Sequence, residues 1–408
     1  MIKKTILENG LTVVTESIDH VQSISMGLWV KAGSRHEGED LAGISHFLEH
    51  MNFKGTAKRT ARDLAEVLEC RGGQLNAYTT KEYTNFYCQT VKEDYDLAMD
   101  VLSDLFLHSA FRSEDMEKEK KVVLEEINLY EDSPEDLVID MLNEVCWPEH
   151  PLGRPILGYE KQVKSFTPEI LKAYRAKMYT PDHSVLAIVG SFDYDEIIGS
   201  VKKYFGDFAG NGITMLFDAP PCRSGSMVKE KDIAQEHICI GFPAYSVFHE
   251  HYYGSILLNE YLGGCASSLL FQKIREEQAL SYSVYSFITA YEDTGLLTVY
   301  AGTSPGLGET VKELCYAEID AVAKNGMPKE KLLQLRQQIN GSMRLAADSL
   351  GSRLSRLGRN ELFFHRYIPV EEVVERINEV TVEEIAAIAK DVLDPDRAAL
   401  AFLGGNAE

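Results

Sequence analysis

The 408-residue sequence has few cysteines, no long apolar run and fewer basic than acidic residues. Its 7 cysteines are odd in number and widely spaced, with no CxxC pair, which is typical of reduced thiols in a reducing compartment. No segment reaches the roughly 18 apolar residues that a membrane span needs. The N-terminus starts basic, but Glu8 interrupts it before a signal-peptide core can form. We therefore expect a cytoplasmic protein with no membrane partner.

The charge balance excludes a further class of partner. The chain has 63 Asp and Glu against 41 Lys and Arg, which gives a formal net charge of −22. This excess argues against nucleic acid, because phosphates would be repelled, and it mildly favours a cationic ligand, although a solvated acidic surface is the simpler interpretation. With 45% hydrophobic and 10% aromatic residues, the chain can build folded cores.

An internal repeat organises the sequence. Residues 167–190 and 381–404 each contain a Thr that can cap a helix, an amphipathic segment, a Pro-Asp turn and an apolar run closed by glycine. A period of this length indicates two similar domains rather than a solenoid. We predict a catalytic domain at 1–210, a linker at 211–226 and a similar second domain at 227–408.

The order of predicted elements indicates an α+β fold. Alternation of apolar and polar residues predicts strands over 5–16 and 22–32, and residues 74–91 are typical of a hairpin. Apolar spacing predicts helices at 42–52, 60–71, 93–108 and 113–131. We expect each domain to be a mostly antiparallel sheet with helices packed on one face.

One string of residues can carry metal chemistry. His46, Glu49 and His50 lie on a predicted helix and, at 100° per residue, project from one face. Two imidazoles one turn apart can chelate Zn²⁺, and a carboxylate beside them can take a proton from metal-bound water. The alternative is a polar helix face that carries two histidines by chance, but Phe47 and Leu48 predict a largely buried helix.

A catalytic zinc site needs a third protein ligand. The predicted helix at 113–131 offers Glu119 and Glu126, which are seven residues apart and share a face. Val122 and Val123 flank that face, so both carboxylates are drawn inward. Taken alone, this helix would still be interpreted as an ordinary charged surface.

The sequence resembles the inverted zinc motif of the pitrilysin family of zinc metallopeptidases. The resemblance rests on the string that starts at His46 and on Glu126 in Val-Val-Leu-Glu-Glu-Ile, and it covers the whole chain. By appearance, the nearest members are the mitochondrial processing peptidase β-type subunits and their bacterial homologues. The resemblance implies one Zn²⁺ per chain, held by His46, His50 and Glu126, with Glu49 as the catalytic base and Glu119 as a supporting catalytic carboxylate.

The resemblance also implies a substrate path. Asn76 and Ala77 match positions where the family pairs an extended peptide with an edge strand. Arg275 and Tyr282 match a segment that steadies the substrate carbonyl and the oxyanion. Without the family, all four would be interpreted as ordinary strand or helix residues.

The second domain departs from the metal pattern, because Leu257 and Tyr261 stand at the places of the two histidines. Larger family members enclose their substrate with four such domains on one chain, so the resemblance implies that two copies of this chain pair as a homodimer around a chamber. We expect a zinc endopeptidase that cleaves short or unfolded peptides, basic ones in particular. A non-catalytic subunit or a peptide-holding protein is the alternative.

Overall fold

The computed structural model describes residues 1–210, 212 and 219–405. The chain forms two compact units, and neither is continuous in sequence. The first unit consists of Met1–Ile127, Pro155–Leu216 and Arg344–Ile368, and the second of Asn128–Arg154, Phe217–Met343 and Pro369–Glu408. These units interleave, whereas the sequence predicted sequential domains at 1–210 and 227–408. Of the predicted linker at 211–226, residues 211 and 213–218 lie outside the described residues, and Gly225 and Ser226 already belong to a strand.

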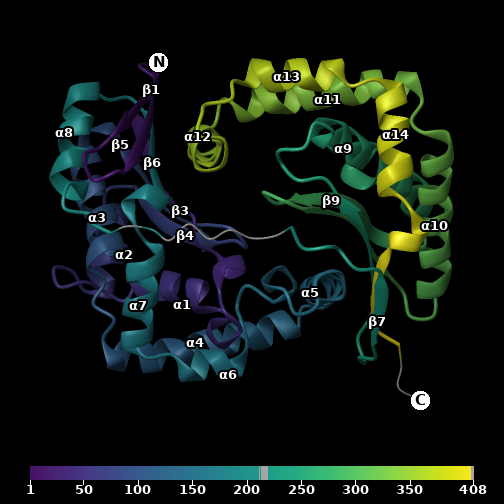
Figure 1. The fold of residues 1–408 in the computed structure, drawn as a ribbon, viewed down its shortest axis with the longest axis horizontal. Coiled ribbons are helices and arrows are strands. Elements are labelled where there is room, and N and C mark those ends of the chain that lie inside the picture. The colour runs from purple at the N-terminus through teal and green to yellow at the C-terminus, as the bar shows by residue number, and fades with distance from the viewer. Residues whose placement is uncertain (211, 213–218, 406–408) are drawn as a thin grey trace. The chain divides into compact units, whose positions relative to one another are not determined.

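The first unit is built on a sheet in which six strands are described (Figure 1). The strands are β1 (Ile2–Ile6), β2 (Thr12–Ser17), β3 (Ser23–Val30), β4 (Gln74–Thr79), β5 (Thr84–Val91) and β6 (Ser184–Gly190). Their order is β1-β2-β6-β3-β5-β4, and only the β2–β6 pair is parallel. The prediction of one strand over 5–16 is wrong, because the chain turns back at Gly10, whose φ of 94° suits glycine.

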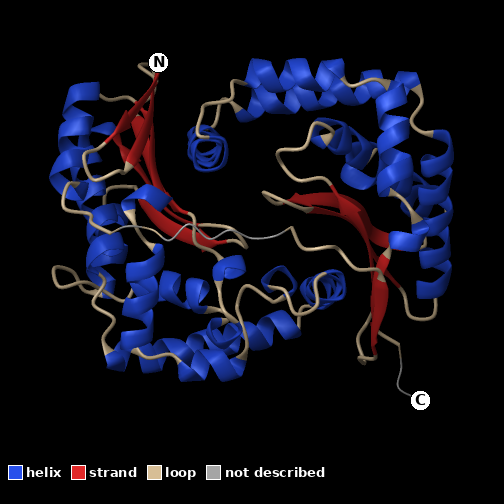
Figure 2. Cartoon of the chain, in the orientation of Figure 1, coloured by secondary structure: helices blue, strands red, loops and turns tan. Residues whose placement is uncertain are grey.

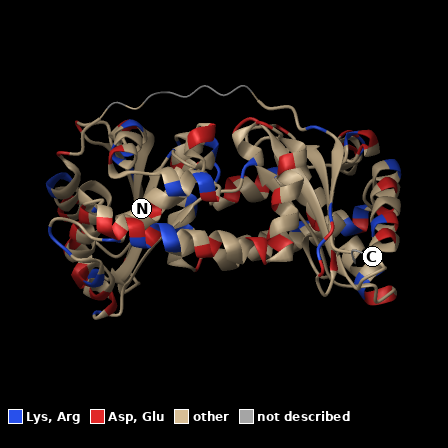
Figure 3. Ribbon diagram, turned by 90° about the horizontal axis from the view of Figure 1, so that it is seen from below, with Lys and Arg blue, Asp and Glu red and all other residues tan. Residues whose placement is uncertain are grey.

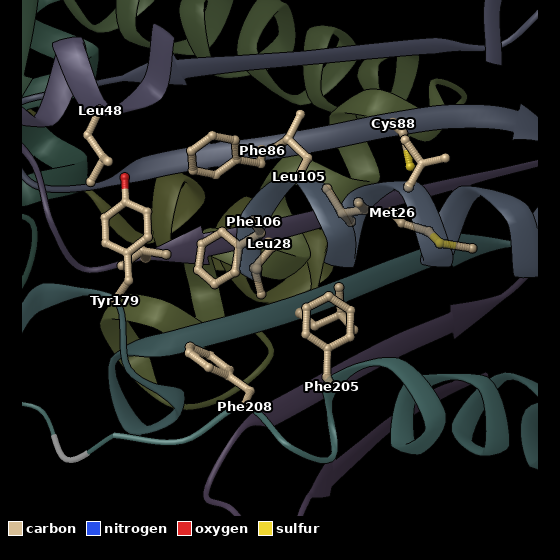
Figure 4. Close-up of a cluster of buried hydrophobic side chains, with 14 of the residues drawn as sticks. Met26, Leu28, Leu48, Phe86, Cys88, Leu105, Phe106, Tyr179, Phe205 and Phe208 are labelled. Atoms are coloured by element: carbon tan, nitrogen blue, oxygen red, sulfur yellow. The ribbon is translucent and has the colours of Figure 1, made fainter. Parts of the chain in front are cut away.

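Most helices of the first unit cover one face of this sheet. They are α1 (Ile44–Asn52), α2 (Ala61–Glu69), α3 (Tyr95–His108), α4 (Ser113–Glu131), α6 (Glu160–Ser165), α7 (Pro168–Met178) and α8 (Tyr194–Phe205). Leu186 and Ile188 of β6 point to this side, into a core that Phe106 and Phe205 help to fill (Figure 4). The four helices predicted in this region are therefore confirmed, with ends that differ by a few residues.

A single helix, α12 (Leu350–Phe364), covers the opposite face of the first sheet. Val185 and Ala187 alternate with the residues above and point to this second side, where they meet Leu354 and Leu357 of α12. Because both faces are covered, β6 is buried along its whole length, which explains its unbroken apolar run.

The second unit repeats the same topology. Its strands are β7 (Gly225–Lys229), β8 (Glu236–Ala244), β9 (Ser281–Ala290), β10 (Gly295–Thr303) and β11 (Ala399–Leu403), in the order β7-β11-β8-β10-β9. Only β7 and β11 run parallel, as β2 and β6 do in the first sheet. The duplication and the α+β fold class are therefore confirmed.

Helices also cover both faces of the second sheet (Figure 2). On one side lie α9 (Tyr252–Asn259), α10 (Gly308–Asn325), α11 (Lys329–Ala346), α13 (Val370–Glu379) and α14 (Val382–Val392). On the other lies α5 (Pro134–Cys146), which packs on β8 and β11. Each unit thus takes one covering helix from the other half of the sequence, α5 in the second unit and α12 in the first.

Charged residues follow the layers of the fold. Figure 3 shows Lys, Arg, Asp and Glu gathered on helices and loops, while the strands carry few of them. Over the described part of the chain, no helix combines the length and the apolar composition required to cross a membrane.

Candidate metal centre

The helix α1 presents the predicted metal-binding string from a buried position. Its residues Phe47, Leu48 and Met51 are fully buried in the core of the first unit. The helix starts after Gly43, whose φ is 91° and where an added Cβ would lie 2.4 Å from the Leu157 carbonyl oxygen. Only glycine fits this position, so the entry of the helix is fixed by sequence.

A buried carboxylate holds the N-terminus of α1. The amides of Gly43 and Ser45 donate to Glu37 Oε2 and Oε1 at 2.6 and 2.8 Å. These are helix N-terminal amides that would otherwise lack acceptors. Burial raises the pKa of Glu37 to about 7, although the two amides and Lys81 act to lower it. Sequence reasoning did not single out this residue.

Three predicted ligands meet at one point. Nε2 of His46 and Nε2 of His50 lie 3.7 and 3.5 Å from Glu126 Oε2, and ligand atoms of these three residues lie within 4.8 Å of one another. These separations are too long for hydrogen bonds. They fit a shared ion, because bonds of about 2.0–2.1 Å at tetrahedral angles put zinc ligands about 3.3 Å apart.

The polar atoms at this point agree with a metal site. Glu126 Oε2 is buried and has no hydrogen-bond partner among the described residues, which is costly unless a cation binds there. Burial lowers the pKa of His46 to about 3, so its imidazole stays neutral and can offer a lone pair. Burial also raises the pKa of Glu126. A cation would provide the missing partner for the buried Oε2 of Glu126, so the residues present fit zinc.

Glu119 supports the site from α4 without joining the ligand group. Its Oε1 lies 2.8 Å from His50 Nδ1, and its Oε2 lies 2.6 Å from Lys54 Nζ. Burial acts to raise the pKa of Glu119, but the contacts with His50 and Lys54 outweigh it and the pKa is lowered. For His50, burial is outweighed by Glu119 and the neighbouring carboxylates, so its pKa is raised.

Glu49 lies on the same helix face but is held by the sheet. Thr79, at the end of β4, donates its hydroxyl to Glu49 Oε2 at 2.5 Å. Burial raises the pKa of Glu49, against the opposing effects of Thr79 and His50. A half-buried carboxylate beside a candidate metal site, with a raised pKa, has the character of a general base. Sequence analysis had singled out neither Thr79 nor Lys54, since both contacts join elements distant in sequence.

Asn76 and Ala77 lie in β4, which is an edge strand of the first sheet among the described strands. The Ala77 amide donates to the Asn76 side chain at 2.8 Å. β4 also packs against α1, the helix that carries His46 and His50 (the metal helix), so this edge runs beside that helix.

Arg275 and Tyr282 lie in the second unit, on a π-helical turn at Phe271–Glu277 and on β9. The Arg275 guanidinium carbon lies 4.4 Å from the centre of the Tyr282 ring and 4.6 Å from that of Phe271. The Tyr282 side chain is 75% exposed. The structure therefore brings these two predicted residues together in one stack.

The second unit lacks a metal group at the equivalent helix. Leu257 is fully buried in the core and Tyr261 follows on a π-helical turn. Within the described residues, His46, His50 and Glu126 form the one group of His, Cys, Asp and Glu side chains close enough to hold a metal ion.

Comparison with known proteins identifies the family. The family described as insulinase (peptidase family M16) matches residues 12–160, and the peptidase M16 inactive domain matches residues 165–339. The chain is 39% identical over 407 residues to the uncharacterized zinc protease YmxG of Bacillus subtilis, covering 100% of this chain and 99% of that protein. An uncharacterized zinc protease of Rickettsia felis is 34% identical over 95% of this chain and 93% of its own length.

Solved structures share the fold. A protease from Helicobacter pylori superposes with a TM-score of 0.93 over 99% of both chains, at 19% identity. A peptidase M16 inactive domain from Pseudomonas fluorescens gives a TM-score of 0.94 at 19% identity, over 100% of this chain and 98% of that one. The chain belongs to peptidase family M16, and the prediction of a pitrilysin-family zinc metallopeptidase is confirmed.

Proposed function

We propose that this metalloprotease is an endopeptidase that cleaves short or unfolded peptides, with Glu49 as the general base. The observation that carries the proposal is the convergence of His46, His50 and Glu126 beside Glu49, a half-buried carboxylate with a raised pKa. Three protein ligands leave zinc an open position, as in catalytic zinc sites. Zinc held there would supply a Lewis acid that polarises the scissile carbonyl and makes water more acidic.

The protein side chains do the proton transfer and the positioning. Glu49 takes the proton of the attacking water and passes it to the leaving amine. Thr79 occupies Glu49 Oε2, so we assign the proton to Oε1. Glu119 accepts a hydrogen bond from His50 Nδ1–H. This bond directs Nε2 of the His50 ring toward the ligand group.

The test is Glu49→Gln in the full-length chain, followed by zinc analysis and by cleavage of a peptide library. We expect about one zinc per chain in both proteins and a turnover that falls by roughly 10²–10⁴-fold in the variant. If the wild type binds zinc and peptide but cleaves nothing, it is a peptide-holding protein or a non-catalytic subunit. If chelated protein neither takes up zinc nor regains cleavage on adding it, the proposal fails.

The substrate we propose is extended and cationic. The edge strand β4 offers free backbone beside α1, which supports strand addition by an unfolded peptide. The net charge of −22 supports a preference for basic sequences. Cleavage of matched basic and acidic peptides across ionic strength measures this preference. Equal cleavage rates for the basic and the acidic peptides at low salt would contradict the proposed preference for cationic substrates.

We further propose that two chains pair around an enclosed chamber in the cytoplasm, and that Arg275 and Tyr282 serve the zinc site of the partner. The Tyr282 ring is 75% exposed and stacked on Arg275, and tyrosine is a residue type enriched at interfaces, which supports a role in contacting another molecule. Mixing Glu49→Gln with Tyr282→Phe chains tests this arrangement, because a mixed dimer would contain one site with neither defect. Activity above that of either variant supports it. Confirmed exchange without recovery contradicts it.

A further inference from the structure

Lys54 lies just beyond the metal helix and points back to it. Its amide donates to the Met51 carbonyl at 3.2 Å, so the chain continues the helical turn past the end of α1. Its Nζ lies 2.6 Å from Glu119 Oε2, in a pair whose lysine side chain is 34% exposed and whose carboxylate is 4% exposed. The buried carboxylate of Glu119 is therefore paired with the ammonium of Lys54, whose side chain is partly exposed to solvent.

The two oxygens of Glu119 are divided between two partners. Oε1 lies 2.8 Å from His50 Nδ1, while Oε2 contacts Lys54. A buried carboxylate rotates less freely when each of its oxygens has its own donor. We propose that Lys54 is a positioning residue of the metal centre, which holds Glu119 so that Glu119 fixes the ring and the tautomer of His50. This inference rests on the proposed zinc function and adds a residue to it.

The loop that follows Lys54 is itself tied to the core. Thr56 donates its hydroxyl to Asp104 on α3 at 2.8 Å, and Arg59 donates to the same carboxylate at 2.7 Å. Arg112 donates to the Thr56 carbonyl at 2.8 Å. These bonds fix the backbone on the C-terminal side of Lys54, so its ammonium meets Glu119 from a set direction.

Charge alone predicts the opposite effect from positioning. Lys54 is a cation close to a site for a dication, so removal of its charge should tighten zinc binding if only Coulomb repulsion acts. If Lys54 positions Glu119, its removal should weaken binding. Loss of a partner bonded directly to a metal ligand, as Glu119 is to His50, typically weakens metal affinity by about 10- to 100-fold. Lys54 is one contact further out, so this range is the upper limit of its effect. The direction of the change in zinc affinity therefore distinguishes Coulomb repulsion from positioning of Glu119.

Lys58 provides a matched control within the same loop. Its Nζ lies 2.6 Å from Asp100 Oδ1, the same separation as in the pair of Lys54 with Glu119, but its side chain is 60% exposed. Asp100 bonds to Arg59 as well and belongs to α3 rather than to the metal site. Lys58→Met removes the same charge and the same kind of ion pair without a link to His50.

The experiment measures the zinc affinity of the metal-stripped, full-length protein by competition with a chromophoric chelator. We expect Lys54→Met to bind zinc more weakly than wild type, by at most the roughly 10- to 100-fold that loss of Glu119 itself would cause. Lys54→Arg should stay within a few-fold of wild type, and Lys58→Met should match it. Thermal unfolding of the metal-free proteins checks that each variant is folded. If Lys54→Met does not fold, the comparison passes to Lys54→Gln, with the same expectation.

Two results would overturn the inference. One is a Lys54→Met affinity equal to or tighter than that of wild type, and the other is an equal loss in Lys58→Met. Failure of the zinc function itself looks different, because wild type and Glu126→Gln would then bind zinc equally poorly. If Glu126→Gln binds zinc weakly while wild type and Lys54→Met both bind it tightly, the positioning role of Lys54 is rejected and the zinc function stands.

Discussion

Replacing Glu37 by glutamine should change the pH dependence of stability in a direction that the structure fixes. Glu37 is buried, with 4% of its surface exposed, and accepts the amides of Gly43 and Ser45 at the start of the metal helix. Burial raises its pKa from 4.5 to about 7. The folded protein therefore binds more protons than the unfolded chain between these two pH values.

The sign and size follow from linkage. A carboxyl whose pKa is raised on folding makes stability fall as pH rises through the window from 4.5 to about 7. Each pKa unit corresponds to 1.36 kcal/mol, so the full effect is about 3 kcal/mol. Glutamine does not titrate. The free energy of unfolding of wild type, minus that of Glu37→Gln, should therefore decrease by about 3 kcal/mol between pH 4.5 and 8.

Urea unfolding at a series of pH values measures this difference. The neighbouring His36, whose pKa burial lowers to about 3, titrates in both proteins and cancels in the comparison. Glu39→Gln, which removes an exposed carboxylate two residues away, should give a difference that stays nearly constant. A Glu37 difference that rises with pH would refute the reasoning, since it would mean that Lys81 and the amides outweigh burial and lower the pKa.

Two further substitutions test the packing and the site. Gly358→Ala should destabilise the protein by roughly 1–3 kcal/mol, because overpacking is costly and the new Cβ would lie 2.4 Å from the Trp29 ring. Gly351→Ala on the same helix has only a side-chain oxygen at 3.8 Å, so equal stability of the two variants would contradict the close packing. Thr79→Val should lower turnover while zinc affinity stays unchanged, because Thr79 contacts Glu49 and not the ligand group. A matching loss of zinc affinity would argue against the assignment of Thr79 to Glu49 alone.

The ligand string could be predicted because its information is local. His46 and His50 are one helical turn apart, and Glu119 and Glu126 are two turns apart, so helical periodicity alone puts each pair on one face. That the two helices meet was not in the periodicity and came from the family resemblance. The contacts of Thr79 with Glu49 and of Lys54 with Glu119 join elements far apart in sequence, and no residue spacing reports them.

The strand errors have a similar origin. Alternation over 5–16 indicated an extended chain, but a hairpin alternates as well as a single strand does, and only Asn9-Gly10 marks the turn between β1 and β2. The apolar run that closes the first repeat, within 167–190, is β6, and it is unbroken because a strand buried on both faces has no polar residues to interrupt the pattern.

The exchange of α5 and α12 explains why the repeat was visible while the unit boundaries were not. A duplicated pattern of strand, helix and turn survives in sequence, but an amphipathic helix shows only that it needs an apolar partner and does not identify which sheet provides one. In the first sheet, α12 buries Trp29 and one face of β6, and α12 comes from the half of the sequence that lacks the His46–His50 string. The sheet that contains β4, whose Thr79 donates to Glu49, is therefore covered on one face by residues beyond 340. The second half of the chain, through α12, is consequently part of the structural unit that holds the candidate metal centre.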